Sequence, residues 1–120
     1  MIQENKELLL KDLCARLPYG VKYQCSDIKN IWKLNAILTK RRDDGVLLDI
    51  YNPLELCKPY LFPLSSMTEK QTHEFLSTCN CYCEYYWTEE TFDWLNAHHF
   101  DYRNLIDKSL ALDATGLNIY

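Results

Sequence analysis

The first apolar pattern in the chain has the spacing of a helix. Four residues of the stretch ENKELLLKDLCARLPYG occupy the i, i+3, i+4 and i+7 positions of one face: Leu10, Leu13, Cys14 and Leu17. Pro18 and Gly20 follow, and both residue types end helices. We therefore predict a helix in the first part of the sequence, with Cys14 as a small residue of the core.

The spacing then changes to the alternation of β-strands in residues 21–25, 30–40 and 46–51. The positions expected to face inward are Val21, Tyr23 and Cys25, then Trp32, Leu34, Ala36 and Leu38, then Val46, Leu48 and Ile50. Asp44-Gly45 is a dipeptide that favours the positive φ of tight hairpins. Because tight turns join antiparallel neighbours, we predict an antiparallel meander of about three strands.

The second half of the chain carries mainly helical signals. Pro53 and Pro59 interrupt the alternation, so residues 58–67, KPYLFPLSSM, are predicted to be an extended connector. Ser66 and Glu69 have the spacing of a capping box, which predicts a helix from about residue 67 to residue 78.

A second helix is predicted to begin at Thr88 as its cap, with an apolar side made by Phe92, Trp94 and Leu95. A last short helix is expected on Tyr102, Leu105 and Ile106. The predicted fold class is α+β: an N-terminal helix, an antiparallel meander of about three strands and a helical C-terminal half, in a single domain of residues 1–120.

Composition and charge narrow the classes of function. Of 120 residues, 48% are apolar and 25% are charged, which is typical of a globular protein. The formal net charge of −4 argues against a surface built to neutralise nucleic-acid phosphates. The same charge fits a soluble protein, or one that docks onto a basic surface of another macromolecule.

The N-terminal residues MIQENKELLLKDLCARLP lack the basic and apolar regions of a secretory signal, and no stretch approaches the length of a membrane span. We therefore expect a cytoplasmic protein that does not enter a membrane. The six cysteines are then expected to be free thiols in a reducing compartment.

The most unusual chemistry lies in STCNCYCEYYW, residues 77–87, where Cys79, Cys81 and Cys83 alternate. Structural zinc sites use cysteines two to four residues apart, and the chain has no second pair with that spacing. We predict thiols without a bound metal. A metal- or thiol-dependent protein that uses this cluster stays open as the alternative function.

Acid–base chemistry has one candidate group, formed by His98, His99 and Asp101. The chain has none of the sequence motifs of nucleophilic hydrolases, nucleotide-binding loops or zinc proteases. We therefore predict that the protein is not an enzyme and needs no cofactor. A small hydrolase built on these three residues is kept as a further alternative.

The aromatic end of the same stretch is a candidate interaction surface. Tyr85, Tyr86 and Trp87 are consecutive, so they cannot all face inward on a strand or a helix. Tyr and Trp dominate the binding energy of protein interfaces. We predict that these three residues bind a partner.

Three stretches of the chain resemble a known family: KELLLKDLCARLPYGVK, KPYLFPLSSMTEKQ and DWLNAHHFDYRNLIDKSLALDATGLNIY. The family comprises small uncharacterised proteins encoded by phages, prophages and mobile elements of gut-type bacteria. The resemblance covers about half of the chain, leaves out the stretch from Cys79 to Trp87, and carries no catalytic or binding residues.

The resemblance implies a bacterial host cytoplasm and a non-enzymatic accessory role. The partner it implies is a host protein that is bound and modulated or inhibited, and that offers a basic nucleic-acid-binding surface. CRISPR nucleases of host defence belong to that class. Direct binding of nucleic acid is not expected.

Overall fold

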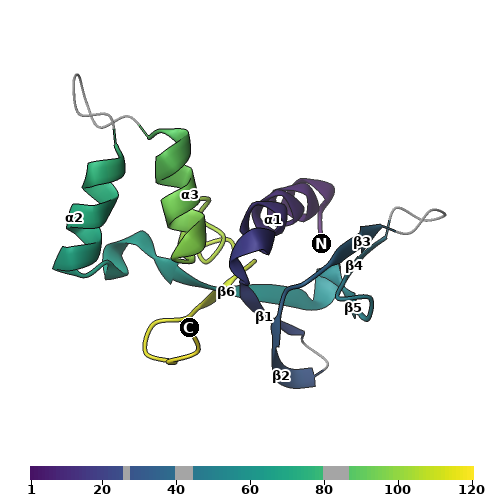
Figure 1. The fold of residues 1–120 in the computed structure, drawn as a ribbon. Helices are drawn as coiled ribbons and strands as arrows, with labels where there is room; N and C mark the ends of the chain where they lie inside the picture. The colour runs from purple at the N-terminus through teal and green to yellow at the C-terminus, as the bar shows by residue number, and fades with distance from the viewer. Residues whose placement is uncertain (26–27, 40–44, 80–86) are drawn as a thin grey trace.

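The computed structural model describes residues 1–25, 28–39, 45–79 and 87–120, with residues 28 and 29 described by their backbone alone (Figure 1). The helices are α1 (Gln3–Arg16), α2 (Glu69–Thr78) and α3 (Glu89–Ala97), with short 3-10 turns at Leu17–Tyr19, Leu54–Leu56 and Leu64–Ser66. The strands are β1 (Lys22–Cys25), β2 (Ile28–Lys33), β3 (Ile37–Thr39), β4 (Val46–Leu48), β5 (Asn52–Pro53), β6 (Cys57–Pro63), β7 (Phe100–Asp101) and β8 (Leu112–Asp113). The fold is α+β, as predicted.

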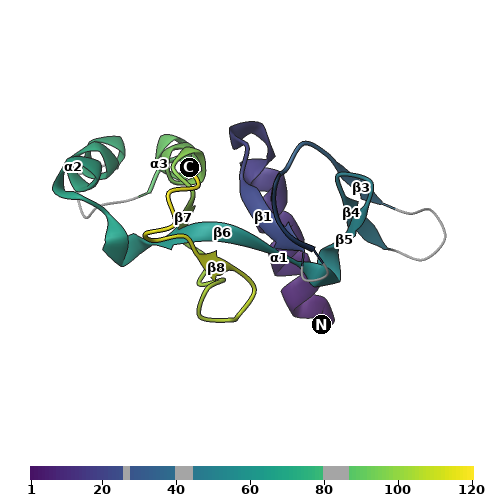
Figure 2. The ribbon, with the colours of Figure 1, turned by 90° about the horizontal axis from the view of Figure 1, so that it is seen from below.

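The described residues form an elongated body of 49 × 29 × 24 Å. Strand β6 runs along its length, with α2 and α3 at one end and β3, β4 and β5 at the other (Figures 1 and 2). Helix α1 lies between them, over the start of the main sheet. The two ends are therefore built from different kinds of secondary structure.

The main sheet has the order β2-β1-β6-β7, and β8 also pairs with β6. Strand β1 is antiparallel to both β2 and β6, whereas β7 and β8 are parallel to β6. The segment predicted to be an extended connector is thus the central strand, and that part of the prediction was wrong.

Pro59 misled the prediction, and the register explains why the sheet accepts it. Leu34 N–H donates to Val21 O at 2.9 Å, so by the alternation of an antiparallel ladder Tyr23 also bonds toward β2. Pro59 lies opposite Tyr23. It therefore occupies a position that makes no backbone hydrogen bond to β1, where the missing N–H costs nothing.

The predicted strand over residues 30–40 is interrupted, so β2 and β3 belong to different sheets. The Asp49 carboxylate accepts the backbone N–H groups of Asn35 at 2.8 Å and Ala36 at 3.1 Å. These bonds separate the two ladders at Asn35, because Leu34 N–H still bonds to Val21 O and Ala36 O still accepts Asp49 N–H. The inward positions predicted for Leu38 and Ile50 were wrong, because both side chains are exposed.

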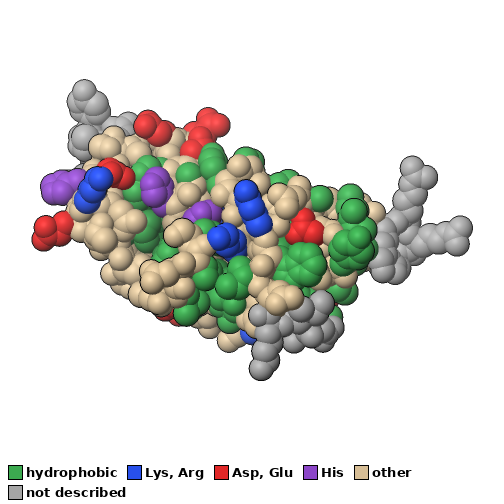
Figure 3. All heavy atoms as spheres, turned by 60° about the horizontal axis from the view of Figure 1, so that its bottom comes forward, with side chains coloured by type: hydrophobic (Ala, Val, Ile, Leu, Met, Phe, Trp, Pro, Cys, Tyr) green, Lys and Arg blue, Asp and Glu red, His purple; other side chains and the backbone are tan. Residues whose placement is uncertain are grey.

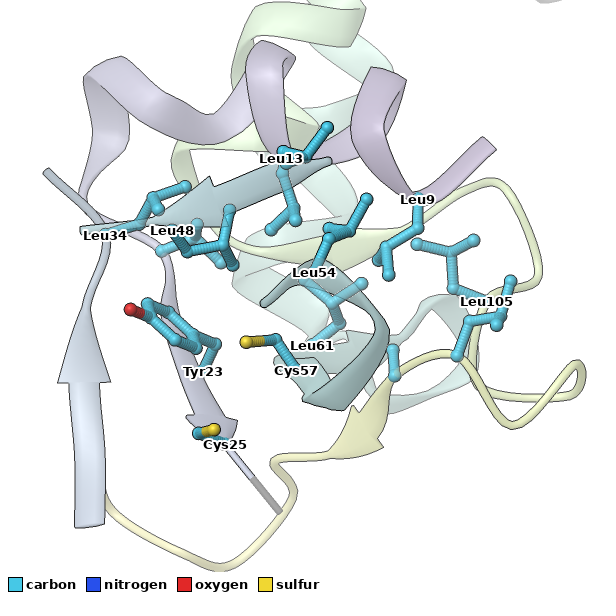
Figure 4. Close-up of a cluster of buried hydrophobic side chains, with 14 residues drawn as sticks. Leu9, Leu13, Tyr23, Cys25, Leu34, Leu48, Leu54, Cys57, Leu61 and Leu105 are labelled. Atoms are coloured by element: carbon cyan, nitrogen blue, oxygen red, sulfur yellow. The ribbon is translucent and has the colours of Figure 1, made fainter. Parts of the chain in front are cut away.

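The core fills the space between α1 and the two sheets (Figure 4). Val21, Tyr23 and Cys25 are all buried, as the alternation predicted. Helix α1 differs from the prediction, because Cys14 is exposed. The buried face of this helix consists of Leu9, Asp12, Leu13 and Arg16. The apolar spacing alone could not indicate that Asp12 and Arg16 form a buried ion pair. Because they do, the buried face of α1 is rotated toward these two residues.

The cap of α2 lies two residues later than predicted. Thr68 Oγ1 accepts Gln71 N–H at 3.1 Å, and Gln71 Oε1 accepts Thr68 N–H at 3.0 Å. Ser66 instead donates to Pro63 O within the preceding 3-10 turn. Thr88 caps α3 as predicted, with Thr91 as its reciprocal partner. Among the helices of the described segments, none combines the length and apolarity needed to cross a membrane.

The last predicted helix is absent, since residues 102–111 form bends and turns. The Asp101 carboxylate accepts the backbone N–H groups of Arg103, Leu105 and Ile106, and Asn104 has a φ of 58°. These features close a turn and are incompatible with a helical ladder.

The C-terminal tail packs against its own chain. Tyr120 Oη donates to Tyr60 O at 2.7 Å and accepts Lys22 N–H at 2.8 Å. The hydroxyl thereby bridges β1 and β6 beyond the last pair of their ladder. Burial raises the pKa of this phenol, which keeps it protonated and able to donate.

Candidate interaction surface

Trp87 lies at the centre of an aromatic cluster at the helical end. Its ring makes edge contacts with Phe75 at 5.7 Å, Phe92 at 5.5 Å and Tyr102 at 6.3 Å between centroids. Trp87 and Phe92 are each 38% exposed. We call Trp87, Phe92 and Tyr102 the aromatic surface. Tyr85 and Tyr86, the other two predicted partner-binding residues, lie outside the described residues.

Three threonines fix the position of this surface. Thr88 Oγ1 and Thr91 Oγ1 both donate to Thr78 O, each at 3.0 Å, so the last turn of α2 is tied to the first turn of α3. Thr91 is fully buried. Because Trp87 directly precedes the Thr88 cap, this clamp holds its backbone in place.

A buried charged network supports the aromatic surface from below. Asp12 accepts Arg16 Nε at 2.9 Å and Arg103 Nη1 at 2.8 Å, and Arg103 Nη1 also donates to Tyr102 Oη. The guanidinium groups of both arginines lie over the Tyr102 ring, at 5.3 and 4.6 Å from its centroid. Arg16 Nη2 donates to Phe100 O, which joins α1 to β7. The aromatic surface is therefore backed by a fully buried Asp12–Arg16 ion pair and by the partly exposed Arg103.

Acidic side chains lie on the helix that carries Phe92. Glu89, Glu90 and Asp93 on α3 are all exposed, and residues 69–97 contain six acidic residues and one lysine. Figure 3 shows acidic side chains gathered toward the end that carries α2 and α3. Apolar rings with an acidic rim have the chemistry to bind a basic surface on a partner.

The three cysteines of the candidate cluster are only partly described, since Cys81 and Cys83 lie outside the described residues. Cys79 is buried at the end of α2, where its thiol contacts Phe75 O at 3.5 Å and Thr91 Oγ1 at 4.0 Å. In the described part of the chain no three His, Cys, Asp or Glu side chains are placed to hold a metal ion.

Two other cysteines lie side by side on neighbouring strands. Cys25 and Cys57 are directly opposed in the β1–β6 register, and both are buried (Figure 4). Burial, reinforced by the neighbouring Cys25, raises the pKa of Cys57 to about 12. A thiol with so high a pKa is almost never the reactive thiolate at neutral pH.

The three candidate acid–base residues lie close together in the sequence, but each makes contacts that stabilise the fold. They are His98, His99 and Asp101. His98 Nδ1 contacts Trp94 O at 2.9 Å, and its ring stacks on Trp94. His99, with a φ of 63°, stacks on Tyr120 at 3.7 Å between centroids. Burial, with the nearby positive charge of Arg16, lowers the pKa of His99 to about 4. The oxygens of Asp101 accept three backbone amides, as described above.

A hollow of about 370 Å³ lies beside Asp101, between Pro63–Ser65 and the turn at residues 104–107. Asp107 and Asp113 line it as well. Asp101 already accepts three backbone amides, and the described residues that line this hollow form no group placed to hold a metal ion.

The sequence pattern predicted Trp87 as a partner-binding residue but did not indicate its structural neighbours. Phe75 and Phe92 were assigned only as helical residues, and Tyr102 to a helix that does not form. The acidic run around α3 was a signal available in the sequence. No known protein family, curated protein or solved structure matches this chain.

Proposed function

We propose that this chain is a non-enzymatic protein, carried by a phage or mobile element, that binds and modulates or inhibits a protein of its bacterial host. The aromatic surface is its contact region. The observation that carries the proposal is the pair Trp87 and Phe92, half-exposed rings held on a clamped frame next to the acidic side chains of α3.

Large side chains that are exposed yet immobile suit the centre of an interface. Binding does not have to order them, because the threonine clamp and the Asp12 network already do so. The acidic rim favours a basic partner surface, since complementary charges speed association and fix orientation. A basic nucleic-acid-binding face, such as that of a CRISPR nuclease of host defence, is the partner class we propose.

The structural use of His98, His99 and Asp101 favours binding over hydrolysis. Cys79 likewise packs within the helical end, which favours this reading over a thiol-dependent function.

The proposal is tested by affinity capture from lysate of a gut-type bacterium, with the wild-type chain and two variants. Trp87→Ala with Phe92→Ala is expected to lose captured partners. Tyr51→Ala is the matched control, because Tyr51 is an exposed aromatic residue at the opposite end. Displacement of the captured protein by added nucleic acid is the expected sign of a basic nucleic-acid-binding face. Equal capture by the double variant and the wild-type chain would overturn the proposal.

A further inference from the structure

Strand β2 forms an open edge of the main sheet. It lies at the end of the order β2-β1-β6-β7, and in the described part of the chain it pairs only with β1. Because Trp32 and Leu34 bond toward β1, the alternation turns the backbone groups of Ile31 and Lys33 toward the open side. Lys33 O accepts Asn35 Nδ2 at 3.1 Å. Ile31 N–H, Ile31 O and Lys33 N–H are left facing outward.

The two faces of β2 differ sharply in chemistry. Trp32 stacks on Tyr23 on the core face, at 6.4 Å between centroids. On the solvent face Ile31 is 48% exposed and Lys33 is exposed. An apolar residue and a cation thus lie side by side along the open edge.

Lys33 is also placed directly opposite Lys22 in the β1–β2 register. The Lys22 ammonium group is directed to Ile119 O and to the Tyr120 ring, at 5.7 Å from its centroid. The Lys33 side chain instead lies across Gly20, where an added Cβ would come within 2.7 Å of Lys33 Cε. The described residues provide no ion-pair partner for the Lys33 ammonium group. An anionic group of a partner next to Lys33 would supply that ion pair.

The charge of the segment indicates which occupant fits. Residues 28–39, the described part of this region, contain two lysines and no acidic residue, although the whole chain has a net charge of −4. A second copy pairing antiparallel with β2 would bring Lys29 and Lys33 of both chains together, which like-charge repulsion opposes. A nucleic-acid backbone has acceptors for Ile31 N–H and Lys33 N–H, but its phosphates have no donor for Ile31 O. An extended polypeptide has both.

We propose that the open edge of β2 binds an extended acidic segment of a partner protein as an added strand. Main-chain hydrogen bonds to Ile31 and Lys33 supply the affinity common to strand addition. An apolar residue of the partner packs on Ile31, and an acidic residue two positions away contacts Lys33. This surface is separate from the aromatic surface, which lies at the helical end.

The probe is a fluorescent peptide, TETVTET, whose glutamates and valine share one face of a strand. The control peptide TKTVTKT has the same length with reversed charge. Anisotropy titration at low salt is expected to show binding of TETVTET, and at least about tenfold weaker binding of TKTVTKT. Binding of TETVTET is expected to fall as salt is raised.

Three variants separate the contributions of backbone and charge. Ile31→Pro removes the outward N–H without removing a bond to β1, and Ile31→Ala keeps the N–H and loses only the side chain. We expect the proline variant to weaken binding of TETVTET about tenfold more than the alanine variant does. Lys33→Glu is expected to exchange the preference, so that TKTVTKT binds better than TETVTET. Circular dichroism and thermal unfolding show whether Ile31→Pro is folded, and Lys33→Glu supplies the test if it is not.

The proposal is overturned if Lys33→Glu leaves the peptide preference unchanged. It is also overturned if a single-stranded oligonucleotide of similar length binds the wild-type edge more tightly than TETVTET, or if β2 variants abolish a dimer of the free chain. Trp87→Ala is expected to leave peptide binding intact, and Lys33→Glu to leave host-protein capture intact. Each proposal can therefore fail without the other.

Discussion

The helical end and the β2 edge carry side chains of opposite charge. They also differ in how far their surface groups are fixed by buried contacts. At the helical end, buried polar contacts fix exposed rings: Thr91 and Asp12 are both fully buried, and their partners come from other elements. At β2, Ile31 and Lys33 are exposed, and Ile31 N–H, Ile31 O and Lys33 N–H face the open side of the sheet. The first region is preorganised for side-chain contact, and the second has unused main-chain bonding capacity. Our two proposals therefore assign partners of opposite charge to the two regions.

The buried network beneath the aromatic surface offers the strongest way to break this contrast. Asp12→Ala leaves two arginines without their shared carboxylate, and we expect a loss of about 3–5 kcal/mol in the free energy of unfolding. The matched control is Glu55→Ala, which removes the exposed Lys6–Glu55 pair at 3.4 Å and should cost less than about 1 kcal/mol. Urea denaturation of both variants measures the difference. Equal losses would mean that the helical end is no more dependent on buried charge than the sheet end.

His99 links the helical end to the C-terminal tail and should make stability depend on pH. Its pKa of about 4 lies below the ordinary value of 6.5, so the unfolded chain takes up the proton first as the pH falls. Stability from this group is complete above pH 6.5 and is lost between pH 6.5 and 4, by about 3 kcal/mol.

Unfolding free energies at several pH values, for the wild type and His99→Asn, isolate this contribution. Asparagine tolerates the positive φ at this position, so the backbone is kept. The variant is expected to lose less stability than the wild type on acidification. His73→Gln is the control, because His73 is exposed on α2 and should leave the pH dependence unchanged. Parallel curves for wild type and His99→Asn would refute the expected role.

The hydrogen bonds from Thr88 and Thr91 to Thr78 O allow the two ends to be compared through the loss of one hydroxyl group. Thr91→Val keeps the shape of the side chain but removes the donor to Thr78 O and the acceptor for Thr88 N–H. We expect a loss of about 1–3 kcal/mol. Thr39→Val, on the exposed β3, is the matched substitution at the sheet end and should change stability by less than about 0.5 kcal/mol. Thermal unfolding of both variants tests the prediction, which fails if the two substitutions are equivalent.

Thiol reactivity gives the smallest effect, a difference in rates with no expected change in stability. Under native conditions iodoacetamide should modify Cys14 rapidly and leave Cys25 and Cys57 protected, because only the first is exposed. Peptide mass spectrometry over time measures each site.

Elemental analysis of the same chelator-free preparation is expected to show no stoichiometric zinc or iron. Stoichiometric metal would restore the alternative that uses Cys79, Cys81 and Cys83.

Local patterns in the sequence were sufficient for several elements. The helical spacing before Pro18 predicted α1, the alternation of Val21 and Tyr23 predicted β1, and Thr88 predicted the start of α3. Each of these signals depends on residues within one or two turns of chain. Trp87 could also be predicted as a candidate partner-binding residue, because three consecutive aromatic residues cannot all be buried.

Other features depend on residues that are distant in sequence. The interruption between β2 and β3 is made by Asp49, more than a dozen residues after Asn35. Similarly, the buried face of α1 includes Asp12 because Arg103, from the far end of the chain, approaches it. No window of neighbouring residues contains that information.

The sequence by itself determined the α+β class, the position of the main helices and the presence of exposed aromatic chemistry, because periodicity and capping act locally. Only the tertiary structure decided that KPYLFPLSSM supplies a central strand, that Cys14 faces solvent, and that β2 is an open edge. Those outcomes depend on which strands become neighbours and on which buried charges find partners. Strand pairing and the burial of charged groups depend on contacts between distant parts of the chain, so the local sequence pattern cannot predict them.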